Sequence, residues 1–234
     1  MTIKSMGYST TTELGWVDIR LSKESIDFLS KIVKKGEENY KSSKDSLVGN
    51  ISNSFDIEDE DGWFYGNILS PTLDYYMKCN KKVFEDEQSH FRHSYIIRDK
   101  NNKKIEPSDF TIELSTFWAN YQKKHEFNPM HNHSGLFSFV IWLKIPYEHE
   151  EQCKLPFLDG IHEESKNPGE FQFFALDAFG KIKNYGYRLG KEDEGRMMLF
   201  PSELRHCVYP FYKTDENRVS ISGNLNLAYR YDVA

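Results

Sequence analysis

Alternating apolar and polar residues dominate the second half of the chain and predict β-strands. Residues 109–121 (DFTIELSTFWANY) alternate, which predicts one strand face formed by Ile112, Leu114, Thr116 and Trp118. Residues 137–145 (FSFVIWLKI) form a continuous apolar run, typical of a buried strand. The same reasoning predicts further strands at 171–189 (two strands around a turn at 177–180), 196–201 and 218–229. Short strands with turns between them and no interleaved helices indicate a mainly β fold, a sandwich or barrel.

The first half of the chain predicts two helices. Residues 22–36 have an apolar stripe at helical spacing, with Ser22 as the N-cap and Gly36 just beyond the end. A second helix is expected over 70–86, capped by Ser70 and followed by a proline at its first position. The chain therefore reads as α+β, with helices supporting a β core.

The organisation that follows is a single domain. Residues 1–105 form a helical or mixed N-terminal support, and residues 106–234 form the β core. Two polar segments, 51–65 and the long loop 147–170, are candidates for a lid over a binding site.

Composition excludes several classes of function. The net charge of −6 gives no support to a nucleic-acid partner. Three cysteines without a CxxC pair fit a reducing compartment, so we expect a cytoplasmic protein without disulfides. The N-terminus shows no apolar signal segment, and the longest apolar stretch has nine residues, half of the roughly 18 that a membrane helix needs. We therefore expect no membrane partner.

Two histidines stand one residue apart at the entrance of the strand 137–145, in FNPMHNHSGLF. Side chains at i and i+2 of an extended segment point to the same side, so His131 and His133 present their imidazoles to one point. A triangular metal face needs a third ligand, and His206, in LFPSELRHCVYP after a buried strand, is the best candidate. The alternative is that the pair are polar residues of a turn.

The strand after His206 has a polar face suited to an anion. In RVSISGNLNLAY, Arg218, Ser220 and Ser222 share one side. A guanidinium pairs with a carboxylate through two hydrogen bonds, and serine hydroxyls can add another. The alternative is a strand whose polar face lies in water.

Together these motifs resemble the Fe(II)/2-oxoglutarate-dependent oxygenases, most closely a prolyl-hydroxylase-like family found in phages of marine cyanobacteria. The resemblance covers residues 110–228 and rests on EFNPMHNHSGLFSFVIWLKIP and EGRMMLFPSELRHCVYPFYKTDENRVSISGN. It implies a double-stranded β-helix, a jelly-roll core that holds Fe(II) inside one end, with 2-oxoglutarate and O2 as cosubstrates.

The resemblance also implies roles for single residues. His131 and His206 correspond to iron ligands, and Arg218, assisted by Ser220, to the group that grips the far carboxylate of 2-oxoglutarate. Asn120 or Tyr121, on the strand before the histidine pair, is expected to contact the cosubstrate.

The sequence departs from the family pattern at His133, which stands where the usual triad of two histidines and one carboxylate has its acid. We favour a face of three histidines. The alternatives are an acid from elsewhere, with Glu126 and Asp159 as candidates, or a lost metal role.

The expected function is a dioxygenase that uses Fe(II) and 2-oxoglutarate to hydroxylate an unidentified substrate, with a prolyl residue of a protein or peptide as the family-level hypothesis. A cupin-type metalloenzyme without 2-oxoglutarate is one alternative, because GRMMLFPSELRH is close to the second cupin motif. A non-catalytic jelly-roll binding or structural protein is the other. The oligomeric state does not follow from the sequence.

Overall fold

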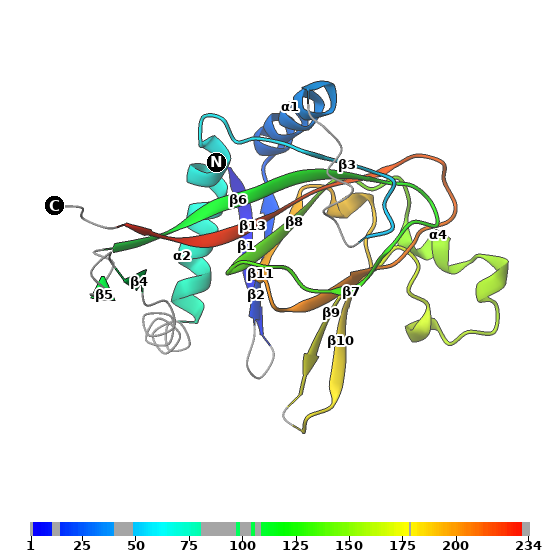
Figure 1. Cartoon of the computed structure of the whole chain (residues 1–234). Coiled ribbons are helices and arrows are strands. Elements are labelled where there is room, and N and C mark those ends of the chain that lie inside the picture. The colour runs from blue at the N-terminus through cyan, green and yellow to red at the C-terminus, as the bar shows by residue number, and fades with distance from the viewer. Residues whose placement is uncertain are drawn as a thin grey trace.

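The computed structural model describes residues 2–10, 15–39, 49–80, 97–98, 104–105, 109–177 and 179–230. The chain forms two facing antiparallel sheets, with helices on the outer face of the larger sheet (Figure 1). No helix of the described residues is both long and apolar enough to cross a membrane. The distal part of the predicted second helix, 81–86, lies outside the described residues.

The larger sheet has seven strands in the order β1-β2-β11-β8-β13-β6-β3. Their bounds are β1 Ile3–Thr10, β2 Gly15–Leu21, β3 Asn53–Asp56, β6 Asp109–Gln122, β8 Phe137–Lys144, β11 Arg196–Pro201 and β13 Arg218–Arg230. The smaller sheet has the order β10-β9-β12-β7. Its strands are β7 Asn128–His131, β9 Phe171–Leu176, β10 Ile182–Tyr187 and β12 Arg205–Val208. A separate pair joins β4 (Ile97–Arg98) to β5 (Lys104–Ile105).

From β6 to β13 the chain passes back and forth between the two sheets. Strands β6, β8, β11 and β13 belong to the large sheet, and β7, β9, β10 and β12 to the small one. This alternation is the winding of a double-stranded β-helix, so the predicted jelly-roll core is confirmed. In Figure 1 the β9–β10 hairpin projects from the body of the molecule.

Helices cover one face of the large sheet through an apolar cluster. Leu29 and Val33 of α1 (Lys23–Asn39) and Leu73 of α2 (Ser70–Cys79) pack against inward residues of β2, β6, β8, β11 and β13. The opposite face packs on the small sheet through a second cluster that includes Trp142 and Phe173. The core therefore has two layers of apolar side chains, one on each side of the large sheet.

The two predicted helices form, with different ends. Ser22 caps α1 as expected, because its Oγ accepts the Ser25 N–H at 3.2 Å. The helix continues through Gly36 instead of ending there. A Cβ at that position would lie 2.5 Å from Ile57 Cγ2, so the glycine allows close packing of the helix on the sheet.

Ser70 is not an N-cap. It lies in helical geometry between a π-helical turn, η2 (Tyr65–Leu69), and α2. The cap is Asp59, whose two carboxylate oxygens accept the N–H groups of Phe64 at 2.9 Å and Tyr65 at 2.8 Å. A capping residue this far from the apolar stripe was not evident from the sequence.

Strand β6 changes face at a bulge. Its pairing with β13 shifts between Thr116 and Leu114, which leaves Ser115 as the extra residue. Ile112 and Leu114 therefore face the helices, whereas Trp118 faces the small sheet. The prediction that Ile112, Leu114, Thr116 and Trp118 share one face was wrong for this reason.

The N-terminal part of the chain is more than a support. Strand β2 pairs with β11, and β3 pairs with β6, so both belong to the same sheet as the core strands. Segment 51–65, proposed as a lid, contains the edge strand β3 and hydrogen-bonds to the sheet through Ile57 N–H and Phe117 C=O (2.9 Å). The loop 147–170 contains three short helices, α4 (His149–Cys153), η3 (Pro156–Leu158) and η4 (Glu163–Ser165).

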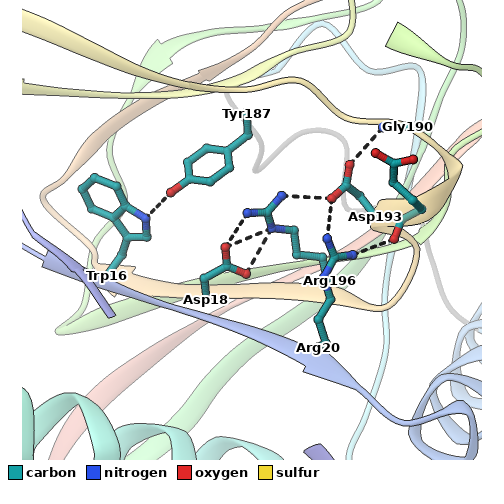
Figure 2. Close-up of polar contacts among 8 residues, drawn as sticks. Trp16, Asp18, Arg20, Tyr187, Gly190, Asp193 and Arg196 are labelled. Atoms are coloured by element: carbon teal, nitrogen blue, oxygen red, sulfur yellow. Dashed lines mark hydrogen bonds and ion pairs between the residues drawn. The ribbon is translucent and has the colours of Figure 1, made fainter. Parts of the chain in front are cut away.

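A polar network closes one side of the barrel (Figure 2). Arg196 of β11 donates from Nε to both carboxylate oxygens of Asp18 of β2, at 3.0 and 3.1 Å, and from Nη1 to Asp193 at 2.9 Å. Its guanidinium lies 4.6 Å from the ring centroid of Tyr187 in β10. The Tyr187 hydroxyl accepts the Trp16 indole N–H at 2.5 Å. These contacts fasten the edge of the small sheet to the large one.

Candidate metal and cosubstrate site

Strand pairing brings three imidazoles together. His131 at the end of β7 is directly opposite His206 of β12 in the small sheet. His133 follows β7, and its backbone N–H donates to the Ser202 carbonyl at 2.9 Å. One nitrogen from each of the three rings lies within 4.8 Å of the other two. The prediction that residues 75 positions apart in sequence meet at one point is confirmed (206 − 131).

The ring nitrogens are oriented as metal ligands require. Nδ1 of His131 bonds to the Pro129 carbonyl at 2.7 Å, and Nδ1 of His206 to the Leu204 carbonyl at 2.9 Å. A carbonyl fixes the proton on Nδ1, which leaves the Nε2 lone pair for an ion. Nε2 of His133 and His206 are 3.2 Å apart. With metal–nitrogen bonds of about 2.1 Å, two ligands at a right angle lie about 3.0 Å apart, so the residues fit a divalent metal.

Burial keeps the three imidazoles neutral. It lowers the pKa of His131. Burial, together with the repulsion that a protonated His131 would exert, lowers the pKa of His133 to about 4. Burial, together with His131 and His133, also lowers the pKa of His206 well below its ordinary value. Only the neutral ring can bind a metal ion, so the cluster is ready to bind a cation at neutral pH.

The imidazoles open into a pocket between the two sheets. Its volume of about 90 Å³ suits a small organic acid rather than a peptide. One wall is polar and comes from β13 and β6, with Arg218, Ser220 and Ser222 on the first strand and Asn120 and Gln122 on the second. The rest of the lining is mostly apolar, with Asn128 as a further polar residue: Gly49, Ile51, Trp118, Phe139, Val140, Trp142, Phe171, Phe200 and Val208.

Arg218 is a buried cation surrounded by neutral acceptors. Its side chain is 2% exposed. Nε and Nη2 donate to Gln122 Oε1 at 3.2 and 2.5 Å, and Nη1 donates to Tyr147 Oη at 2.6 Å and the Gly169 carbonyl at 2.8 Å. A guanidinium has five N–H groups, so one, on Nη2, is left over. Among the described residues, neither these partners nor the pocket lining includes a carboxylate.

The other predicted site residues divide into two groups. Asn120 and Ser220 line the pocket, and the Asn120 Oδ1 is held by the Ser54 hydroxyl at 2.7 Å. Tyr121 does not reach it. Adjacent residues of a strand point to opposite faces, so Tyr121 packs on Phe55 and its hydroxyl donates to Glu37. Of the two alternatives, Asn120 or Tyr121, the structure therefore places Asn120 in the pocket and directs Tyr121 away from it.

The spare acids do not complete the metal face. The Glu126 carboxylate accepts the backbone N–H groups of Ser52 at 3.1 Å and Lys123 at 2.9 Å. Asp159 is an exposed residue of the long loop, and neither acid lines the pocket. Of the three alternatives, the arrangement favours a face of three histidines.

Several residues of the pocket were not anticipated. Gln122 and Tyr147 hold Arg218, and the Trp118 ring lies 5.9 Å from that of His133. Gln122 lies two residues after Asn120 on the same strand, so alternation places both on the pocket face. The sequence alone could therefore have identified Gln122. Tyr147 and Gly169 begin and end a long loop, and nothing local in the sequence joins them to Arg218.

Comparisons with known proteins find one family model and several solved structures that are similar to this chain. Residues 116–224 match the family model described as "Putative 2OG-Fe(II) oxygenase". A solved Pseudomonas putida prolyl-4-hydroxylase is similar over 91% of this chain and 92% of its own, with 14% identity and a TM-score of 0.47. A Burkholderia pseudomallei oxidoreductase of the 2OG-Fe(II) oxygenase family is similar over 51% of this chain, with 17% identity and a TM-score of 0.35.

The chain covers about half of the Burkholderia protein, 47% of its length. No curated protein matches the sequence. The matched segment 116–224 contains all three imidazoles and the arginine of the pocket. This central part of the chain is similar to the family described as "Putative 2OG-Fe(II) oxygenase".

Proposed function

We propose that the protein is a dioxygenase that binds Fe(II) through His131, His133 and His206 and uses 2-oxoglutarate to hydroxylate a C–H bond of a second substrate. Three protein ligands leave three positions on a six-coordinate ion, enough for a 2-oxo acid and O2. The family supports both Fe(II) and 2-oxoglutarate, and the histidine group supports the metal.

The observation that carries the proposal is the charge of Arg218, which no carboxylate among its described partners balances. Burying a cation without a counter-ion is costly, and proteins retain such groups where a ligand supplies the opposite charge. Arg218 lines the same pocket as the three imidazoles. A ligand that spans the two must chelate a metal at one end and carry a carboxylate at the other, which describes 2-oxoglutarate.

The residues of the chain have separate tasks in this proposal. Arg218 binds the far carboxylate through its remaining N–H, and Ser220 adds a hydroxyl donor beside it. Asn120, fixed by Ser54, orients the middle of the cosubstrate. The aromatic walls exclude water from the bound acid. When bound, Fe(II) supplies the oxidative chemistry, in which 2-oxoglutarate is decarboxylated to succinate and a substrate C–H is hydroxylated.

The pocket does not select the second substrate. A prolyl residue in a protein or peptide is the first class to assay. The loop 147–170, whose ends contact Arg218, is the proposed lid.

The three cysteines are free thiols, which fits a reducing compartment such as the cytoplasm.

The test is anaerobic titration of the purified protein with Fe(II) and then 2-oxoglutarate. We expect a weak visible absorption band only when both are present, followed by oxygen uptake that depends on 2-oxoglutarate when air is admitted. Metal binding with oxygen uptake independent of 2-oxoglutarate would favour a cupin-type enzyme. Absence of metal binding would leave a non-catalytic jelly-roll protein.

A further inference from the structure

We propose that Gln122 determines the selectivity of the pocket for a carboxylate, because its neutral amide holds the Arg218 guanidinium without neutralising it. The inference rests on the proposed function, since it concerns how that cosubstrate is recognised. Gln122 contacts Arg218 and acts on the ligand through the Arg218 guanidinium.

The geometry of Gln122 explains how it holds the Arg218 guanidinium. It lies opposite Arg218 in the β6–β13 pair and is 3% exposed. Its Oε1 accepts from both Nε and Nη2, and its Nε2 donates to the Glu126 carbonyl at 2.5 Å. Both ends of the amide are therefore used: the oxygen accepts from Arg218, and the nitrogen donates to Glu126.

A glutamate has nearly the same shape and would meet Arg218 in the same place, but it cannot donate to the Glu126 carbonyl. Side chains that hold a buried arginine are commonly acids, because a carboxylate accepts two hydrogen bonds from the guanidinium and cancels its charge. Such an internal ion pair would compete with the carboxylate of a ligand. With glutamine, none of the described hydrogen-bond partners of Arg218 neutralises its charge.

The other neighbours of Arg218 follow the same rule. Tyr147 offers a hydroxyl, which burial keeps protonated by raising the pKa of the phenol, and Gly169 offers a backbone carbonyl. Gly169 has φ of +74°, and a Cβ there would lie 2.8 Å from the Tyr147 ring. The glycine thus allows the Tyr147 ring to pack closely against the backbone that supplies the Gly169 carbonyl. The described neighbours fix the arginine in position while leaving its charge unbalanced.

The experiment measures binding by calorimetry to the Mn(II)-loaded protein with three ligands: 2-oxoglutarate, its 5-amide, in which the far end is uncharged, and 2-oxobutyrate, which lacks the far carboxylate. The parent should bind 2-oxoglutarate at least about 30-fold more tightly than either analogue. In Gln122→Glu this advantage should fall below about threefold, while 2-oxobutyrate binding stays within about threefold of the parent.

Two further variants separate charge from structure. Gln122→Met removes the hydrogen bonds to Arg218 without adding an anion. It should keep most of the preference for 2-oxoglutarate over the two analogues. Lys123→Gln changes the net charge by the same one unit at an exposed position and should leave all three affinities unchanged. Equal losses in the Glu and Met variants, or full selectivity in the Glu variant, would overturn the role of Gln122.

The outcomes distinguish the inference from the proposed function. A parent that binds 2-oxoglutarate no better than its 5-amide contradicts an unbalanced charge, even if Gln122→Glu does not fold. A parent that binds the metal but none of the three 2-oxo acids contradicts the proposed function itself.

Discussion

Lowering the pH from 7.5 to 5.5 should destabilise the metal-free protein through its three site histidines. In the unfolded chain a histidine takes up a proton near pH 6.5. In the fold, burial lowers the pKa of His131, His133 and His206. The unfolded state therefore binds more protons below pH 6.5, so stability is complete above that pH and falls as the solution is acidified.

The size of the effect can be worked out for His133, whose pKa falls to about 4. At pH 5.5 this imidazole is protonated in the unfolded chain and neutral in the fold, which costs about 1.4 kcal/mol, one pKa unit of linkage. His131 and His206 add losses of the same sign. Domains of this kind are stable by roughly 5–15 kcal/mol, so the loss is measurable by urea unfolding in the presence of a chelator.

The comparison uses His133→Asn against the parent between pH 5.5 and 8. The variant should lose at least about 1.4 kcal/mol less stability than the parent over this range. His125→Asn is the matched control, because His125 is exposed and its φ of +69° is one that asparagine tolerates. Identical pH profiles for His133→Asn and the parent would refute the claim that the site is a buried cluster of neutral imidazoles.

Three other predictions follow from single contacts. His206→Ala should abolish retention of Fe(II), and metal analysis showing the parent's stoichiometry would remove His206 from the site. Arg218→Met should weaken 2-oxoglutarate by about 2–5 kcal/mol, or about 30- to 4,000-fold, and an unchanged dissociation constant would contradict the clamp. Arg196→Met should lower the free energy of unfolding by about 3 kcal/mol, since it removes the guanidinium that pairs with Asp18 and leaves Asp193 with Arg20 alone, and an unchanged urea midpoint would show that the network is not stabilising.

The strands and the pairing of the first two site histidines were predictable because both follow from local alternation. An extended segment fixes which residues share a side, so His131 and His133 could be paired, as could Arg218 and Ser220. The phase of the alternation was harder to predict, since one bulge reverses it. The bulge at Ser115 in β6 is not marked by any glycine or proline, and it reversed the predicted face.

Contacts made between distant segments were the part that could not be predicted. Tyr147 reaches Arg218 across 71 positions of sequence, and Gly169 across 49. Neither residue belongs to a strand with a readable face, and their meeting depends on how the loop 147–170 closes over the barrel end. Asp59 was missed as the helix cap for a different reason: the N–H groups that it accepts lie five and six residues further on, beyond the usual capping distance of two or three.

The charges of the pocket imply that metal and cosubstrate bind cooperatively. Three neutral imidazoles bring no negative charge, and Arg218 adds a positive one, so a divalent cation enters a pocket that opposes it. A dianion that bridges the two ends cancels this repulsion. By linkage, the factor by which 2-oxoglutarate strengthens metal binding must equal the factor by which the metal strengthens 2-oxoglutarate binding. A carboxylate in place of His133 would supply part of the negative charge from the protein, so His133→Asp should bind the metal more tightly alone and show a smaller coupling factor.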